Sequence, residues 1–177
     1  MSVSKHLTTL LCCCTLSSCS INDSSNSQPP ISLTDPCEKI NALLKEYDNN
    51  FDRLKLEQSN LKLSQVWKAK YHLVGESCQI WAWGTEKYTY ACSLSAPNKQ
   101  VIDQYFNNAK ATAKRCLSND WISSESTKAD NQGYKIEFSS DKSSAKLAAH
   151  AVPSGNVFKS QWTIYYYFGN IAEPKSQ

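Results

Sequence analysis

The chain reads CQIWAWGTEKYTYAC at residues 78–92, where two apolar and aromatic runs flank a glycine-containing turn at 84–86. Two such runs on either side of a short turn are typical of a β-hairpin. Residues 78–83 and 88–94 are therefore predicted to form antiparallel strands. If the hairpin is centred on Thr85, Cys78 and Cys92 lie directly opposite each other, at roughly the Cβ separation that a disulfide requires.

The residues before this hairpin predict a third strand. In the stretch VWKAKYHLV, residues 66–74, apolar and polar side chains alternate, as in a strand with one buried face. One face carries Trp67, Ala69, Tyr71 and Leu73, and the other carries Lys68, Lys70 and His72. A turn at residues 74–77 would then place Lys70 opposite Trp81 and Lys68 opposite Trp83.

Helices are predicted on both sides of these strands. Asp35 can cap the first helix, Pro36 suits its first position, and Glu38 can complete a capping box. The apolar face of this helix repeats at spacings of three and four and consists of Ile40, Leu43, Leu44, Tyr47, Phe51 and Leu54. The second helix opens at Pro97, and its apolar face consists of Val101, Ile102, Tyr105, Phe106, Ala109, Ala113 and Cys116.

Three more alternating runs follow a polar loop at residues 123–133. They lie at 134–138, 145–151 and 158–168 and predict three further strands. The predicted order is therefore α-β-β-β-α-β-β-β. This order indicates an α+β domain, in which an antiparallel sheet carries both helices on one face. The two halves share an element order, but their residues do not align as a sequence repeat.

The N-terminus carries a targeting pattern. Lys5 precedes a short apolar stretch at residues 7–16, which is too short to span a bilayer as a stable helix. The sequence Leu16-Ser17-Ser18-Cys19 follows, with an aliphatic residue and two small residues before a cysteine. In these residues the chain resembles a bacterial lipoprotein precursor with its lipobox. The resemblance covers residues 1–19 and implies cleavage before Cys19, with lipid on its sulfur and on the freed amine.

The chain is expected to have four parts, of which the resemblance implies only the signal peptide and the lipidated Cys19. Residues 1–18 are the expected signal peptide, and residues 19–34 are the lipidated cysteine and a flexible tether rich in Ser, Asn and Pro. Residues 35–171 are the expected α+β domain, since every aromatic residue lies after residue 35, and residues 172–177 form a tail. Position 20 is Ser rather than Asp, which by the usual sorting rule of the lipoproteins that this segment resembles implies the outer membrane, with the inner membrane as the alternative.

Export would place the domain in an oxidising compartment, where disulfides persist. Of the eight cysteines, residues 12–14 would leave with the signal peptide and Cys19 would carry the lipid, which leaves four. Four cysteines allow three connectivities. The hairpin geometry favours Cys78 with Cys92, which leaves Cys37 for Cys116. The spacings match no zinc site, so we expect two disulfides and no bound metal.

The sequence contains no pattern that identifies a reaction. The formal net charge of the 177 residues is +3, too small a surplus for a nucleic-acid footprint. No HExxH, Gly-x-Ser-x-Gly or Walker sequence occurs. His72 and His150 lie on the polar sides of predicted strands, and acids such as Asp103 and Glu137 cannot be paired from sequence. We therefore predict no catalytic residue and no cofactor.

The first strands suggest a binding face instead. Lys68, Lys70, His72, Trp81 and Trp83 are predicted to share one face of the sheet, where indoles beside ammonium groups would form an interaction surface. Tyr165 and Tyr167 on the last strand are a second candidate. In the alternative, a long loop or the second half of the sheet covers the two tryptophans, and the two tyrosines only pack against side chains of neighbouring strands.

The expected function follows from location and from this face. We expect a lipid-anchored binding module that faces the periplasm and meets a protein or an envelope polymer, as inhibitors, immunity proteins and envelope-assembly factors do. A cell-envelope-processing enzyme and a purely structural envelope component are the alternatives.

Overall fold

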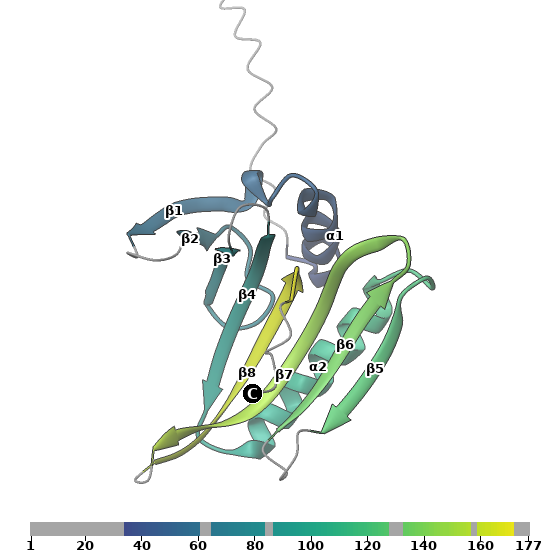
Figure 1. Ribbon diagram of the computed structural model, residues 1–177. Helices are drawn as coiled ribbons and strands as arrows, with labels where there is room; N and C mark the ends of the chain where they lie inside the picture. The colour runs from purple at the N-terminus through teal and green to yellow at the C-terminus, as the bar shows by residue number, and fades with distance from the viewer. Residues whose placement is uncertain (1–33, 61–64, 84–86, 128–132, 157–158, 172–177) are drawn as a thin grey trace, which may run out of the picture. The chain divides into compact units, whose positions relative to one another are not determined.

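Figure 1 shows the chain as a computed structural model, which describes residues 34–60, 65–83, 87–127, 133–156 and 159–171. The expected signal peptide, Cys19, the tether up to residue 33 and the tail at 172–177 lie outside the described residues. The described part of the chain forms two α-helices and an eight-stranded antiparallel sheet.

The elements follow each other in two similar runs. The first run consists of α1 (Pro36–Tyr47), the 3₁₀ helix η1 (Asp52–Leu54), β1 (Lys55–Asn60), β2 (Gln65–Ala69), β3 (Ser77–Trp83) and β4 (Lys87–Ala96). The second run consists of α2 (Lys99–Cys116), β5 (Ile122–Thr127), β6 (Tyr134–Ser140), β7 (Ser143–Asn156) and β8 (Lys159–Gly169). The predicted α+β class is confirmed, but the predicted order lacks β1 and β5 and is wrong in that respect.

The sheet joins the two runs through their last strands. Its order is β1-β2-β3-β4-β8-β7-β6-β5, and all neighbouring strands are antiparallel. Strands β4 and β8 pair at the centre, from Thr89 opposite Gly169 to Ala96 opposite Trp162. Because of this pairing, β3 and β8 flank β4, although they are far apart in the sequence.

One face of the sheet carries the core. Buried side chains of both helices belong to one cluster with strand residues of a single alternation, and Figure 1 shows α1 and α2 behind the sheet. The helices contribute Ile40 and Leu43 from α1 and Ile102, Phe106 and Ala113 from α2. The strands contribute Ile80, Tyr90, Ile136, Phe138, Leu147, Ala149, Ile164, Tyr166 and Phe168, among others. The opposite face is called the open face below.

Two disulfides cross-link the chain in the predicted pairing, one within the first run and one between the two runs. Cys78 pairs with Cys92 across the β3–β4 hairpin, where their Cα atoms are 4.0 Å apart. Cys37, in the first turn of α1, is bonded to Cys116, the last residue of α2, with a Cα–Cα distance of 4.8 Å.

Helix α1 is shorter than its apolar pattern predicts. It starts as expected, since the Asp35 carboxylate accepts the Cys37 N–H at 3.0 Å, but it ends at Tyr47. Asn50 and Phe51 then adopt left-handed φ angles of 56° and 59°. The turn carries the Phe51 side chain into the core, where it is completely buried. The prediction that the helix continues to Leu54 is therefore wrong.

Strand β2 is also shorter than predicted, and its register with β3 differs. The predicted strand runs to residue 74, but β2 ends at Ala69. The chain beyond it packs over Tyr90, whose buried hydroxyl donates to the Tyr71 carbonyl at 2.8 Å and accepts from the Leu73 N–H at 3.1 Å. A buried hydroxyl without partners would be costly, so these bonds favour a loop at 70–76 over a longer strand.

Candidate functional site

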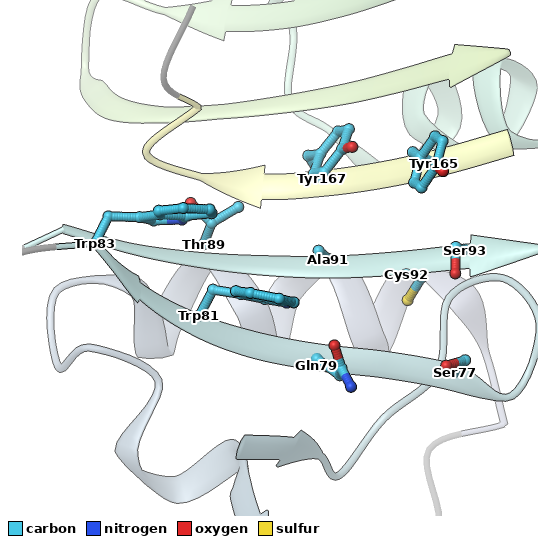
Figure 2. A pocket seen from close by; sticks show the side chains of 10 residues that line it. All are labelled: Ser77, Gln79, Trp81, Trp83, Thr89, Ala91, Cys92, Ser93, Tyr165 and Tyr167. Carbon is cyan, nitrogen blue, oxygen red and sulfur yellow. The ribbon is translucent and has the colours of Figure 1, made fainter. Parts of the chain in front are cut away.

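A groove on the open face lies between β3 and β8, with β4 as its floor (Figure 2). Its volume is about 270 Å³. The lining residues are Ser77, Gln79, Trp81, Trp83, Thr89, Ala91, Cys92, Ser93, Tyr165 and Tyr167. They come from both runs of the chain, so only the β4–β8 pairing assembles this groove.

The two sides of the groove are aromatic. Trp81 and Trp83 are two residues apart on β3, and their rings are nearly parallel, 5.6 Å between centroids. Tyr165 and Tyr167 repeat this arrangement on β8, with centroids 6.0 Å apart. Residues two apart on a strand share a face, so each pair forms a continuous aromatic surface. Figure 2 shows the two pairs on either side of Ala91.

The floor of the groove is low because β4 presents small side chains there. Ala91 lies between Gln79 and Tyr167 in the cross-strand register, and Ser93 lies between Ser77 and Tyr165. Tyr165 and Tyr167 therefore stand directly beside the small residues of β4, whereas Trp81 is opposite Thr89 and borders the depression further along β3. The Cys78–Cys92 disulfide ties β3 to β4 and so fixes one side of the groove to its floor.

The lining is polar in places but carries no formal charge. None of its described residues is a lysine, arginine, histidine or carboxylic acid. The Thr89 hydroxyl donates to the Asn170 carbonyl at 2.6 Å. Burial, with a smaller contribution from Tyr165, raises the pKa of Tyr167 to about 12. Tyr167 therefore keeps its proton at neutral pH and can donate a hydrogen bond.

The aromatic residues differ in their exposure. Trp83 is 51% exposed, at the end of β3, whereas Trp81 and both tyrosines are partly buried. Trp81 is the cross-strand partner of Val66, which is completely buried yet lies outside the helix-side core. The buried side chains of both described helices pack on the other face of the sheet, so the open face can present these rings to a partner.

The structure brings together only part of the predicted lysine and tryptophan face. Trp81 and Trp83 lie in the groove, but Lys68 pairs with Gln79 and Val66 pairs with Trp81. The predicted cross-strand pairs of Lys68 with Trp83 and of Lys70 with Trp81 are therefore wrong. These predictions fail because β2 ends at Ala69 and not at residue 74, and its register with β3 is different from the predicted one.

The remaining members of the predicted face lie elsewhere. Lys70 follows β2, where its N–H donates to the Leu54 carbonyl at 2.9 Å and its ammonium lies 5.7 Å from the Tyr71 ring centroid. His72 lies in the loop at 70–76, and its carbonyl accepts from Lys39 Nζ at 2.9 Å. This loop packs against α1, so His72 is not beside the two tryptophans on a shared strand face.

Sequence reasoning missed the polar and small residues of the groove. Ser77, Gln79, Ala91 and Ser93 carry no motif of their own, and they matter only because of the strands beside them. A partial signal was present, since two aromatic residues alternate with core residues in both 78–83 and 159–169.

The single acids named from the sequence are held by lysines. Asp103 binds Lys99 at 2.7 Å and also accepts a hydrogen bond from the Tyr134 hydroxyl. Partial desolvation raises the pKa of Asp103, but the bonds from Lys99 and Tyr134 outweigh it and the net pKa is lowered. Glu137 binds Lys146 at 2.8 Å. These contacts join α2 to β6 and β6 to β7, and none of the residues that make them lines the groove.

Within the residues that the structure describes, no group of three or more His, Cys, Asp or Glu side chains could hold a metal ion. Neither described helix has the length and apolar character needed to cross a membrane. No family model, no curated protein and no solved structure matches this chain. The site is therefore interpreted from its own geometry, which offers stacking surfaces and neutral hydrogen-bonding groups.

Proposed function

We propose that this chain is a lipid-anchored binding module that faces the periplasm and captures a partner with the groove on its open face. The observation that carries the binding role is the groove itself, with four aromatic rings around a floor of small residues and no charged side chain among the described residues of its lining. Aromatic residues are enriched and charged residues are depleted at the centres of protein interfaces. Inhibitors, immunity proteins and envelope-assembly factors all act by such capture.

Support for the anchored location comes from the lipobox-like sequence alone. Several acyl chains on Cys19 would exceed the two signals needed for stable anchoring, and residues 20–34 would connect the lipid to the domain. Ser20 favours the outer membrane as the site of anchoring. The two disulfides are compatible with an oxidising compartment.

The anchoring is tested by Cys19→Ala. We expect the wild-type chain in the membrane fraction, with a mass that includes acyl chains, and the variant without lipid and released from that fraction. Cys14→Ala is the matched control, because residue 14 would leave with the signal peptide. A wild-type chain with an unmodified Cys19 sulfur, or one found in the soluble cytoplasm, would contradict the proposed location.

The binding role is tested with a photo-crosslinker in intact cells. Ser95 is exposed and lies on the open face of β4, two residues beyond Ser93. We expect p-benzoylphenylalanine at position 95 to form a defined adduct, and the same group at exposed Lys114 on α2 to form none. Trp83→Ser should remove the adduct, yet change the free energy of unfolding by less than about 1 kcal/mol, because this side chain is half exposed. An adduct that persists in Trp83→Ser would exclude the groove as the binding site.

A further inference from the structure

The chemistry of the groove favours one kind of occupant. Aromatic rings can stack on sugar rings as well as on apolar side chains, but among the groove's described lining residues only Gln79 carries a planar polar group that could bind two adjacent sugar hydroxyls. The other polar lining groups are hydroxyls of Ser, Thr and Tyr. Tyr and Trp with small polar residues are the composition with which antibodies recognise proteins, because rigid aromatic rings give contact area at low entropic cost.

The charges around the groove add a second constraint on the kind of partner that it can bind. Strand register places Lys87 opposite Trp83, at one end of the groove. It also places Lys135 opposite His150, which is in turn opposite Tyr165. Among the described residues, no carboxylate lies within ion-pair distance of Lys87 or Lys135.

The other charges on this side of the sheet include acids. Lys146 binds Glu137 at 2.8 Å, and a neighbouring pocket that shares Ser77 and Gln79 with the groove holds Lys68 with Glu57 and Glu76. Among the described residues, the charges without an ion pair are therefore positive at the Trp83 end and on the β6 side of the groove, whereas the Ser77 end has one more acid than base. Interfaces place complementary charges around an apolar centre, which speeds association and selects the partner.

We infer that the groove takes a loop of a partner protein, which inserts an apolar side chain between the tryptophan and tyrosine pairs and directs acidic side chains towards Lys87 and Lys135. This inference rests on the proposed binding function and specifies its partner. The neutral lining accepts the apolar side chain, and the two lysines fix the orientation of the loop.

The test uses the full-length chain in detergent and a phage-displayed library of disulfide-closed loops. We expect the selected loops to combine an aromatic or aliphatic residue with Asp or Glu. Lys87→Glu together with Lys135→Glu should lower the affinity for a synthetic selected loop at least about tenfold. Exchange of the loop's acids for lysines should restore this affinity. Trp81→Ser should lower the affinity for the loop by on the order of 30-fold, as expected for a residue at the centre of an interface. Lys114→Glu on α2 is the matched control and should leave the affinity unchanged.

Other outcomes separate this inference from the proposed function. Loops that depend on Trp81 and Trp83 but carry no acids, or that ignore the lysine reversals, would overturn the acidic partner and leave the groove as a binding site. Loops that bind equally well to Trp83→Ser would count against the groove itself. If soluble peptidoglycan fragments quench the tryptophan fluorescence and no loop is selected, the partner is an envelope polymer and the inference is wrong.

Discussion

Replacing Cys37 and Cys116 together with serine is expected to lower the free energy of unfolding by about 4.5 kcal/mol. The bridge closes a loop with a sequence separation of 79 residues, which contains α1 except its first residue, η1, β1 to β4, and α2. Without it the unfolded chain gains the conformational freedom of this whole loop, whereas the native contacts of the two helices remain. Urea titration of the oxidised wild type and of the double variant, followed by tryptophan fluorescence, measures the difference.

The hairpin disulfide provides the matched control for this loss. Cys78 and Cys92 are only 14 residues apart, so the same reasoning gives about 3 kcal/mol for their double replacement by serine. The side chains of Cys78 and Cys92 are buried in the core. Their replacement therefore also loses packing energy, in addition to the loop-entropy term. A long-loop variant that is no less stable than wild type would contradict the loop-entropy explanation.

Local sequence signals were sufficient to predict a contact where both contacting residues lie close together in the chain. The hairpin register that pairs Cys78 with Cys92 follows from a short turn between two strands, and the structure has the same pairing. The start of α1 at Asp35 and Pro36 depends on capping chemistry within a few residues. The pairing of Cys37 with Cys116 also needed the lipoprotein resemblance, which sets aside residues 12–14 and Cys19 and leaves one pair once the hairpin uses two cysteines.

The errors occurred where tertiary contacts override a local pattern. Phe51 and Leu54 continue the helical spacing of α1, yet they reach the core from a left-handed turn and a 3₁₀ helix. The polar residues 48–50 favour a turn, and the hydrophobic spacing alone could not reveal it. Likewise, the alternation up to residue 74 fits a strand, but hydrogen bonds to the buried Tyr90 hydroxyl hold the loop there.

The edge strands were invisible for a different reason. Every residue of β5 is exposed, so its sequence ISSEST shows no alternation of apolar and polar groups. Strand β1 has a break in register between Lys55 and Gln58, which disturbs its alternation. The candidate groove was visible only as two separate aromatic pairs, because the β4–β8 pairing that joins them connects residues more than sixty positions apart in the sequence.

Phe168→Ala is expected to lower the free energy of unfolding by about 3–5 kcal/mol. This side chain is completely buried, and it lies opposite Tyr90 on β4 and Leu147 on β7. Its ring makes edge-to-face contacts with Tyr47 and Phe51, with centroids 6.2 and 6.1 Å away. The substitution would therefore leave a cavity where the end of α1 and the turn after it pack on the centre of the sheet.

The same substitution tests how the core supports the groove, since Phe168 and Tyr167 are consecutive on β8 and point to opposite faces. Phe168→Leu should lose much less stability, because it fills most of the space, and Leu56→Ala, at a half-exposed position of β1, should lose little. Guanidinium titrations of the three variants measure how much unfolding free energy each one loses. If Phe168→Ala were no worse than Leu56→Ala, the packing of the α1 end on β8 would be wrong. If Phe168→Ala loses stability as expected, the variant should also bind a groove-specific loop more weakly. The reason is that β8 carries one aromatic side of the groove and depends on Phe168 for its position.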